Sequence, residues 1–503
     1  MTASGIETFR GISPAEFFYR NRQMAGFGNP TQALFTTIRE LVENSLDSCE
    51  DAGVLPLIQI QISTESPTTC KITVSDNGTG VPDDKVPEAF ARVLYGSKYS
   101  SRQRRGTFGL GVTMSVLYGQ ITTDSPALIH SRTAESGGTK FSLYIDVEKN
   151  TPIVESSYPQ QRKQQGTTVS ITLNADLKRA RDRIVEYLRL TGISTPHAKI
   201  SLNINEVEHM SFGGHIHTLP PFPTIALPHP RAADLELLRR LVASRIEMPL
   251  HDFLVESFQQ LGHKTAERFL SFIHMDPKKT VGNLDRSELS YLSSSLRKYD
   301  EFGRPSSECL SPIGKDALHS AFGSEYKSTI VTYASRGPLE WDGFPYIIEG
   351  VLAVGDAFEK SDTPTLFRFA NRVPLLYDTS DDVFTKVMKR VSWARYGIQE
   401  SNQVALFMHF CSTRVPYSAA GKQSISSVGC IESEILAIYR DLGRRLKKIS
   451  ERKRRATQSQ RRYREFSRTF KQLTKFSSDV AGAEVVPDTR KMVQDLFEVI
   501  GDV

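Results

Sequence analysis

The sequence predicts an α+β protein built from several domains. Its 503 residues are enough for about three domains at the usual ~100–200 residues each. Short strand-like runs alternate with helical stretches before residue 218, where the proline-rich segment 218–230 interrupts both patterns. A helical stretch and a second mixed region follow. This order predicts a layered α/β domain, a linker, a helical module and a further α/β domain.

The composition limits the classes of protein to consider. Apolar residues make up 39% and charged residues 24%, which is typical of a soluble globular protein. No apolar run reaches the ~18 residues of a membrane span, and the opening MTASGIETFR lacks the pattern of a signal peptide. The five cysteines are scattered without a C-x-x-C pair. We therefore expect a reducing environment, with neither a zinc site nor a disulfide framework.

The net charge of +6 is concentrated in one segment. Residues 444–475 carry 14 Lys and Arg against two Glu, a net of +12, so the other residues sum to −6. From residue 432 to 476, apolar residues recur every three, four or seven positions, at Ile435, Ile438, Leu442, Leu446, Ile449, Ala456, Tyr463, Phe466, Phe470 and Leu473. This spacing predicts one long helix over about 432–476. Its basic side favours a nucleic acid or acidic partner, and a solvated charged face is the alternative.

The remaining elements follow from composition and periodicity. Before the linker we expect strands at 57–63, 71–75, 120–123, 141–147 and 167–173, and helices at 31–52, 113–118 and 180–190. After it we expect helices over 233–300, broken at Gly262 and around 277–282, and then strands at 329–333, 346–354 and 404–411.

The helix predicted over 31–52 has two different faces. Asn29 suits its N-cap, Pro30 its first position and Gly53 its end. One side collects Leu34, Ile38, Leu41, Val42 and Cys49. Glu40, Asn44 and Asp47 fall within an arc of about 60° on the opposite side. Packed on a sheet, this helix would point two acids and an amide at one place. A solvated polar face is the alternative.

Three short segments have ligand-binding character. Asp76-Asn77-Gly78-Thr79-Gly80 follows a predicted strand, where an Asp can accept hydrogen bonds from an amine and glycines admit a flat ligand. The glycines of 106–111 precede the helix that starts at Thr113, where free N–H groups favour phosphate. Gly166-Thr167-Thr168 leads into another strand. Each segment alone is equally typical of a turn or loop.

Taken in order, these segments resemble one ATPase superfamily, which groups gyrase-type topoisomerases, the heat-shock chaperone ATPase, histidine kinases and mismatch-repair ATPases. There is no P-loop motif, and G-x-x-G-x-G is not the dinucleotide fingerprint. ISPAEFFYRN and IRELVENSLDSCE (within 12–50), GSK (96–98) and RRGTFGLG (104–111) are similar to the B subunits of DNA topoisomerase VI. That resemblance implies a Bergerat-type α/β sandwich ATPase domain, a helix-two-turn-helix module, and a transducer α/β domain with a long C-terminal helix.

The resemblance also implies roles for individual residues. Glu40 would be the general base that activates water against the γ-phosphate. Asn44 would bind Mg²⁺ through its amide oxygen, and Asp76 would receive the adenine amino group of ATP. Further ATP contacts are implied at Gly78, Gly80, Ser97, Lys98, Gly106, Thr107, Phe108, Gly109, Leu110, Gly111, Val112, Thr113 and Thr167. Glu43 and Asp47 are expected on the helix surface or behind these contacts.

Five parts of the chain follow from the same resemblance: a dimerisation arm (1–28), the ATPase domain (29–225), the helix-two-turn-helix module (226–306), the transducer (307–476) and a tail (477–503). Lys422, the only lysine in RVPYSAAGKQS (414–424), would be a catalytic and ATP-binding switch lysine reaching the γ-phosphate. A solvated loop lysine is the alternative. GHKTA (262–266) is the expected turn of the helical module, whose role is either DNA contact or structural support.

The implied function is that of the ATP-binding and hydrolysing subunit of a type IIB topoisomerase. ATP would drive self-dimerisation, closing a gate on double-stranded DNA, while a separate A subunit in an A2B2 assembly cuts the DNA. Such an assembly relaxes and decatenates DNA, and would lie in the cytoplasm with the nucleoid. We find no Asp-x-Asp cluster and no identifiable cleaving tyrosine in the sequence, which agrees with a separate cutting subunit. The alternatives are a stand-alone clamp of the mismatch-repair type and a scaffold partner of a strand-cleaving protein. A histidine kinase is excluded because no His precedes His130.

Overall fold

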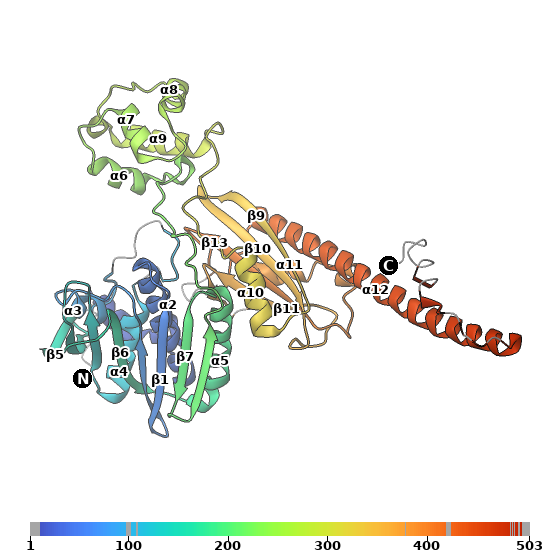
Figure 1. Cartoon of the computed structure of the whole chain (residues 1–503). Helices are drawn as coiled ribbons and strands as arrows, with labels where there is room; N and C mark the ends of the chain where they lie inside the picture. The colour runs from blue at the N-terminus through green and yellow to red at the C-terminus, as the bar shows by residue number, and fades with distance from the viewer. Residues whose placement is uncertain are drawn as a thin grey trace, which may run out of the picture.

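The computed structural model describes residues 11–96, 102–106, 109–377, 379–418, 424–482, 484, 486, 488–490 and 493–494. Figure 1 shows a large sheet with its helices, a small helical module, and a second sheet from which one long helix projects. The extended segment 214–229 leads from the first sheet to the module, as its prolines predict. The predicted multidomain α+β class is confirmed.

The first domain is a two-layer sandwich. Its eight strands run in the order β5-β4-β3-β6-β2-β1-β7-β8. They are β1 (Leu57–Ser66), β2 (Thr69–Ser75), β3 (Ala127–Arg132), β4 (Thr139–Asp146), β5 (Thr151–Pro159), β6 (Gly166–Asn174), β7 (Lys199–Ile204) and β8 (Glu208–Gly213). Alternate residues of β1, β2, β6 and β7 are buried, because only one face of the sheet is covered. The covering helices include α2 (Pro30–Asp51), α4 (Gly111–Thr123) and α5 (Leu177–Ser194), with the short α3 (Val86–Ala91) beside α4.

Helix α2 has the capping predicted for it. The backbone N–H of Gln32 donates to Asn29 Oδ1 at 2.9 Å, and Pro30 opens the helix. At the other end Gly53 has φ +66° and its N–H donates to the carbonyl of Glu50. The apolar side is buried in the core of the sandwich, including Leu34, Ile38, Leu41, Val42 and Cys49.

The predicted strand at 120–123 is wrong, because these residues form the last turn of α4. Their β-branched side chains are accommodated by bonds back to the helix: Thr122 Oγ1 donates to the carbonyl of Tyr118, and Thr123 Oγ1 to that of Gly119. Strands β3, β5, β7 and β8 were not predicted. Strand β5 lies at the edge of the sheet with nearly every side chain exposed, so it lacks the alternation that marks a half-buried strand.

The N-terminal residues from Gly11 onward pack on this domain. They form α1 (Pro14–Arg20) and the 3₁₀ turn η1 (Arg22–Ala25). Phe27 is buried and its ring lies 5.5 Å from that of Tyr118 on α4. Ser13 Oγ donates to the carbonyl of Val147 at 2.6 Å.

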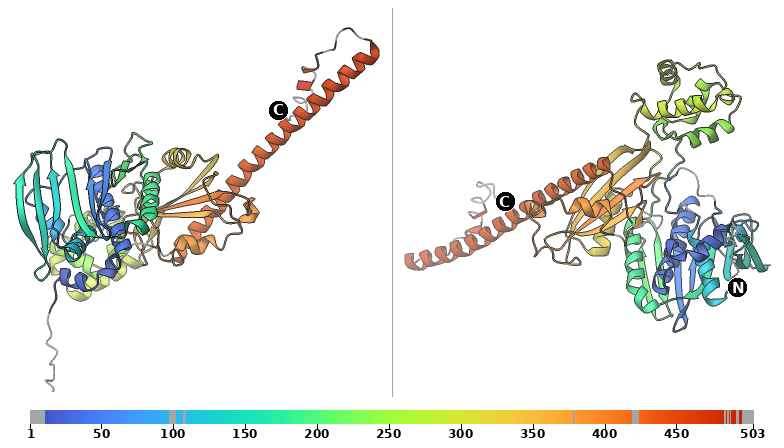
Figure 2. Two further views of the ribbon diagram at one scale, coloured as in Figure 1. Left: turned by 90° about the horizontal axis from the view of Figure 1, so that it is seen from below. Right: turned by 180° about the vertical axis from the view of Figure 1, so that it is seen from behind.

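The helical module contains α6 (Leu235–Ala243), α7 (Leu250–Ser257), α8 (His263–Phe272) and α9 (Arg286–Lys298), with 3₁₀ turns η2 (Pro230–Ala232) and η3 (Val281–Asn283). Gly262 is the N-cap of α8, so the break predicted there is confirmed. A separate core of Phe253, Phe258, Phe269 and neighbouring residues holds the module together. Figure 1 and the right-hand view of Figure 2 show it set apart from the two sheets.

The second sheet has five strands in the order β12-β11-β13-β10-β9. They are β9 (Ile330–Trp341), β10 (Phe344–Val354), β11 (Thr365–Ala370), β12 (Val373–Pro374) and β13 (Val404–Ser412). Helix α10 (Lys315–Tyr326) and the end of α5 pack on one face. Helices α11 (Val383–Met388) and α12 (Gly429–Ala481) pack on the other, and η4 (Trp393–Tyr396) touches α12. The α10 face is the one nearer to the first domain, because α5 belongs to both.

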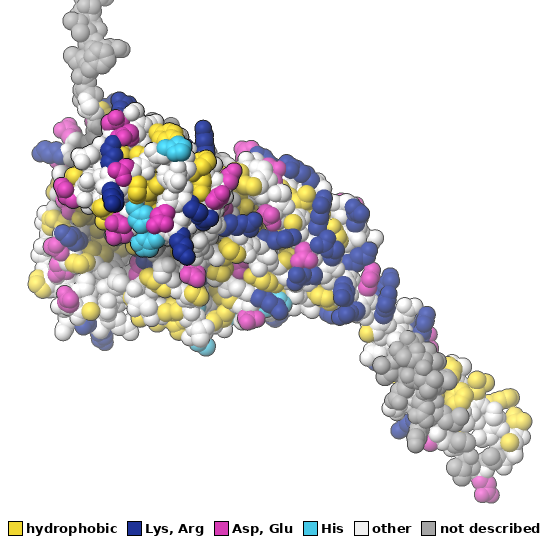
Figure 3. Space-filling view, turned by 90° about the horizontal axis from the view of Figure 1, so that it is seen from above, with side chains coloured by type: hydrophobic (Ala, Val, Ile, Leu, Met, Phe, Trp, Pro, Cys, Tyr) yellow, Lys and Arg dark blue, Asp and Glu magenta, His cyan; other side chains and the backbone are white. Residues whose placement is uncertain are grey.

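Helix α12 extends well beyond the sheet (Figure 2). Its first part buries Ile435, Ile438, Leu442 and Leu446 against the sheet, as the seam predicts. The distal part leaves Phe466, Leu473 and Phe476 exposed. Figure 3 shows Lys and Arg side chains gathered along the second sheet and the adjoining part of this helix. Among the described residues, no helix has both the length and the apolar character needed to cross a membrane.

Candidate nucleotide site

A cavity of about 770 Å³ opens between α2, the ends of β2 and β6, and the start of α4. It brings together eleven of the residues predicted for ATP: Glu40, Asn44, Asp76, Gly80, Gly106, Gly109, Leu110, Gly111, Val112, Thr113 and Thr167. Gly78 lies behind the wall instead of lining it. Ser97, Lys98, Thr107, Phe108 and Lys422 lie outside the described residues.

Asp76 forms the polar floor at one end of the cavity. Its Oδ1 accepts from the backbone N–H groups of Gly78 at 3.0 Å and Thr167 at 3.1 Å, and its Oδ2 accepts from Ser45 Oγ at 3.0 Å. Burial raises the pKa of Asp76 above its ordinary value, and these hydrogen bonds only partly oppose that effect. The surrounding wall is apolar, with Leu41, Val74, Val81, Pro82, Ala89, Phe90 and Val169. A flat heterocycle with one hydrogen-bond donor fits this end.

Glycines let the backbone pack closely around Asp76. A Cβ on Gly78 would lie 2.2 Å from Ser48 Oγ, and one on Gly80, where φ is +70°, would lie 2.0 Å from the carbonyl oxygen of Arg132. The Gly78 N–H then holds Asp76 in place. Gly78 is therefore a support for the carboxylate, while Gly80 is part of the wall.

Glu40 lies at the other end, directly against the start of α4. A Cβ on Gly111 would fall 1.8 Å from Glu40 Oε2, so the carboxylate occupies the space that the missing side chain leaves. Glu40 Oε1 accepts from Arg39 Nη2 at 2.7 Å, and only 14% of each of these two side chains is exposed. A role for Arg39 is not predictable from the sequence, because adjacent residues of a helix do not share a face.

Asn44 lies one helical turn after Glu40 and points into the same cavity. Its Nδ2 donates to the carbonyl of Glu40 at 2.8 Å, which fixes the orientation of the amide. The start of α4 faces these two residues. Because the first N–H groups of a helix have no partner within the helix, Gly111, Val112 and Thr113 present a positive dipole end to the cavity.

Glu43 and Asp47 are both buried, so the part of the prediction that placed them on the helix surface is wrong. Asp47 pairs with Arg105 at 3.0 Å, and Glu43 lies 3.6 Å from Arg39 Nε. The position of α1 and η1 at the cavity was not predicted, yet Phe17, Phe18, Met24 and Ala25 line its edge.

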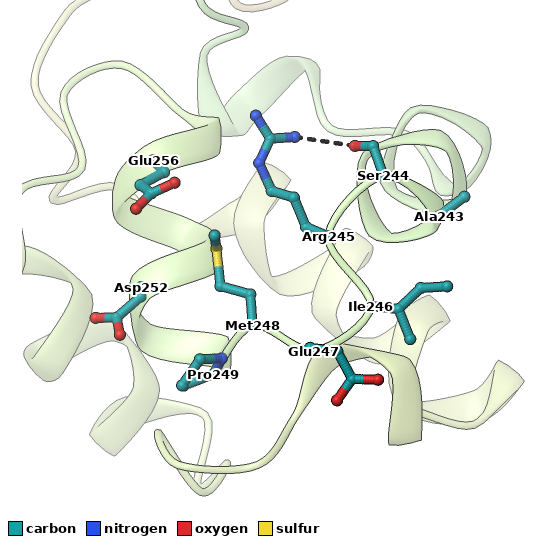
Figure 4. A pocket seen from close by; sticks show the side chains of 9 residues that line it. All are labelled: Ala243, Ser244, Arg245, Ile246, Glu247, Met248, Pro249, Asp252 and Glu256. Carbon is teal, nitrogen blue, oxygen red and sulfur yellow. Dashed lines mark hydrogen bonds between the residues drawn. The ribbon is translucent and has the colours of Figure 1, made fainter.

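Two further features lie in the helical module. A hollow of about 620 Å³ lies between the end of α6 and α7. Figure 4 shows Glu247, Asp252 and Glu256 spread around it without converging on one point. The other feature is a cluster of His251, Asp252 and His263, the only group of metal-ligand type found within the described residues.

This cluster is better explained as an ion pair than as a metal site. His251 Nδ1 lies 2.8 Å from Asp252 Oδ1, and that hydrogen bond raises the pKa of His251, which favours the imidazolium form. Because both ring nitrogens of an imidazolium carry protons, His251 in this form has no free lone pair for a metal ion. The chemistry of the protein is therefore assigned to the first cavity.

The sandwich fold and this cavity define an ATPase of the class shared by histidine kinases, DNA gyrase B and HSP90, whose family model matches residues 29–149. Residues 305–462 match the model of the topoisomerase VI B subunit transducer. The chain is 38% identical over 466 residues to the B subunit of type 2 DNA topoisomerase 6 from Saccharolobus islandicus, covering 91% of this chain and 88% of the relative. It is 35% identical over 508 residues to the corresponding protein of Saccharolobus solfataricus, covering 99% and 96%.

The chain belongs to the topoisomerase VI B subunit family. It is therefore the nucleotide-binding, ATP-hydrolysing subunit of a type IIB topoisomerase, as the sequence predicted. The transducer match and the full-length relatives decide against a stand-alone clamp of the mismatch-repair type and against a scaffold that has no ATPase role.

Proposed function

We propose that the chain hydrolyses ATP at the cavity on α2 and α4, and that nucleotide binding closes a dimer gate around DNA during strand passage. The observation that carries the proposal is the convergence of Glu40, Asn44 and Asp76 with the first turn of α4 on one cavity of about 770 Å³. A carboxylate for the base, an amide oxygen for Mg²⁺ and a buried acceptor for adenine then share one space.

Glu40 is the proposed general base. Its carboxylate lies beside the N-terminus of α4, where the terminal phosphate would be held, and Arg39 fixes one of its oxygens. A carboxylate in this position orients a water molecule and accepts its proton as the water attacks the γ-phosphate. The N–H groups at the start of α4 and the implied switch residue Lys422, in the loop 414–424, stabilise the developing charge.

The residues present fit a bound Mg²⁺. Asn44 supplies a neutral hard oxygen and Glu40 a carboxylate on the adjacent helical turn, which is the donor chemistry that Mg²⁺ prefers. We assign Asn44 as the ligand. The ion would neutralise charge on the phosphates, while Asn44 keeps its orientation through the hydrogen bond to the carbonyl of Glu40.

Dimerisation is assigned to the arm. Residues 11–28 pack next to the cavity, and Ile12, Phe17, Tyr19 and Met24 are exposed large apolar side chains. Phe17 and Met24 also line the cavity edge. A nucleotide bound there would therefore contact the surface that a second copy of the chain covers. The described arm packs on its own domain, and exchange of its first residues with the second copy is the proposed closed state.

DNA and a strand-cleaving A subunit are the proposed partners, in an A2B2 assembly. Helix α12 supports this assignment in two ways. Its segment 444–475 carries the net charge of +12, and its distal apolar residues Phe466, Leu473 and Phe476 are exposed. The basic side chains suit the phosphates of DNA, and the apolar ones suit a protein partner. The helical module is proposed to support the DNA-facing side of the assembly.

Turnover by Glu40→Gln tests the catalytic assignment. The variant should bind ATP with unchanged affinity and lose hydrolysis by about 10²–10⁴-fold, the usual contribution of a general base. Nucleotide affinity is measured by calorimetry and hydrolysis by phosphate release. The matched control is Glu88→Gln on α3, which makes the same change at a carboxylate that pairs with the exposed Arg92. Glu50→Gln is unsuitable as a control, because Glu50 is buried in an ion network. Normal turnover in Glu40→Gln would remove Glu40 as the base.

A further inference from the structure

The cavity wall is fastened to the second sheet by a buried polar network. Residues 102–106 contribute Arg104 and Gly106 to the wall, yet Gln103 and Arg105 point away from it and are buried. Their side chains face the second domain and α2 respectively. A short stretch of chain therefore touches the nucleotide cavity on one side and two different structural elements on the other.

Arg105 holds this stretch to α2. Its Nη1 donates to Asp47 Oδ1 at 3.0 Å and to Glu50 Oε2 at 2.9 Å, and its Nη2 donates to Glu50 Oε1 at 2.8 Å. Burial alone would raise the pKa of Glu50, but Arg105, His197 and Arg372 hold it well below its ordinary value. Glu50 is thus a carboxylate shared by several donors, one of which comes from the second domain.

Gln103 holds the same stretch to the second domain. Its Nε2 donates to the carbonyl of Ser311 at 3.0 Å, and its Oε1 accepts from the Ser311 N–H at 2.7 Å. The side-chain amide therefore pairs with a peptide group in the way that neighbouring strands do. Cys411 Sγ, on β13, donates to the same Oε1 at 3.1 Å. All three residues are buried.

Arg372 bridges the two attachments. It lies with Asn371 in the two-residue turn between β11 and β12, and both have positive φ, +69° and +47°. A positive φ is costly for a long side chain such as arginine. The guanidinium nevertheless reaches across the domains: Nη1 lies 3.4 Å from Glu50 Oε1, and Nη2 donates to Ser311 Oγ at 2.7 Å. In the same turn Asn371 Nδ2 donates to the carbonyl of Arg104 at 3.4 Å.

The network continues into the second sheet. The N–H of Arg372 donates to His409 Nε2 at 3.0 Å, so Nε2 is the unprotonated nitrogen and Nδ1 donates to Glu349 Oε2 at 2.9 Å. Glu349 also accepts from the N–H groups of Ile313 and Gly314, which precede α10. Burial lowers the pKa of His409, in agreement with a neutral ring. Glu349, His409, Arg372 and Asn371 thereby link the start of α10 to Arg104 in the wall of the nucleotide cavity.

We propose that Gln103 and Arg372 are positioning residues that transmit the nucleotide state of the cavity to the second sheet. This connection does not involve Lys422. The inference rests on the proposed function only in assuming that nucleotide occupies the cavity. When the wall at Arg104 and Gly106 moves to contact a nucleotide, it must pull on Ser311 and Asn371, because a buried hydrogen-bonded network cannot stretch without leaving polar groups unsatisfied. Two discrete arrangements are then more stable than intermediate ones.

Hydrogen exchange on the full chain tests this transmission. Exchange is measured with and without a non-hydrolysable ATP analogue and Mg²⁺, and the nucleotide-induced change is compared at two places. One is the cavity, at 106 and 109–114; the other is the segment 311–314 with the turn at 371–372. In the wild-type chain both should change, the second by at least about fivefold, the lower end of usual allosteric couplings.

The variants Gln103→Ala and Arg372→Met should retain the change at the cavity and lose it at 311–314. Arg372→Lys keeps the charge but lacks the bidentate guanidinium, so it should restore only part of the nucleotide-induced change at 311–314. Arg231→Met removes a more exposed ion pair, to Glu340 at 3.0 Å, which links the module region to β9 away from the cavity. It should leave both changes as in the wild type. If a variant only loosened the packing, its exchange rate measured in the absence of nucleotide would rise, but adding nucleotide would still change the exchange at 311–314.

The outcomes distinguish failure of the proposed function from failure of the transmission. No nucleotide-induced change at the cavity of the wild-type chain would contradict the proposed function. A normal cavity response in Gln103→Ala and Arg372→Met, with a wild-type response at 311–314, would overturn the transmission role of these residues. Should Arg372→Met fail to fold, Gln103→Ala decides, since it removes only the pairing with Ser311 and Cys411.

Discussion

Gly111→Ala is predicted to disable hydrolysis without weakening the fold. In the structure the new Cβ would lie 1.8 Å from Glu40 Oε2, 2.2 Å from Cδ and 2.5 Å from Cγ, all below the 3.0 Å that such contacts require. The carboxylate must therefore retreat by roughly 1.2 Å or rotate out of place, and misplacement by ~1 Å is able to cost about 10²-fold in rate. The activation barrier rises accordingly by about 2.7 kcal/mol.

The stability of the variant should stay near that of the wild type. Gly111 opens α4 with an ordinary backbone conformation, so alanine causes no backbone strain, and the displaced carboxylate is the end of a flexible side chain. Phosphate release at saturating ATP gives the rate, and thermal melting gives the stability. Gly429→Ala is the matched control, because Gly429 opens α12 and a Cβ there has nothing within 4 Å. Hydrolysis by Gly111→Ala at the wild-type rate would refute the placement of the base.

The other predictions address the adenine end, the switch residue and the basic helix. Asp76→Asn should weaken ATP binding by about 10–100-fold, as expected for removal of a charge-assisted hydrogen bond, while calorimetric melting at pH 7 shows a stability no lower than that of the wild type. The expected stability follows from the raised pKa of Asp76. Because this pKa is higher in the folded than in the unfolded state, the ionised carboxylate destabilises the fold, and the free energy of unfolding falls as the pH rises from the unfolded-state pKa through the folded-state pKa. A lower melting temperature at pH 7 with unchanged affinity would contradict both parts. Lys422→Ala should slow hydrolysis with little change in nucleotide affinity, and unchanged kinetics would assign it to a solvated loop. Reversing the four charges of 452–455 should weaken DNA binding and reduce the slope of log K against log salt by up to about 0.9 for each phosphate that the helix no longer neutralises. An unaltered slope in a filter-binding titration would leave this part of α12 without a role in DNA binding.

Part of the site was predictable because local sequence determines it. Asn29, Pro30 and Gly53 bound α2, and its 3.6-residue period separates the buried Leu34 and Ile38 from Glu40 and Asn44. Asp76 lies at the end of a strand of clear alternation. The glycines of the α4 start were visible as a motif, but the sequence does not show that Gly111 makes room for Glu40, a contact between residues on different elements.

The inter-domain network could not be predicted from the sequence. Glu50 and Arg372 are separated by 322 residues, and each is an ordinary charged residue in its local sequence. Arg105 directly precedes the glycine segment, which alone is equally typical of a turn or loop, yet its side chain is buried against two acids of α2, Asp47 and Glu50. Two local elements were also not predicted. Edge strand β5 has a weak local pattern and is determined by its pairing with β4, and the β-branched last turn of α4 resembles a strand but is held in the helix by side-chain hydrogen bonds to the preceding turn.

The most direct test of the central claim is the solution mass of Glu40→Gln, measured by light scattering with and without ATP and Mg²⁺. A variant that binds ATP and cannot turn it over should hold the closed state, so we predict a monomer without nucleotide and a stable dimer of about twice the 56.3 kDa chain mass with it. A chain that binds ATP by calorimetry and remains a monomer would contradict the nucleotide-driven gate.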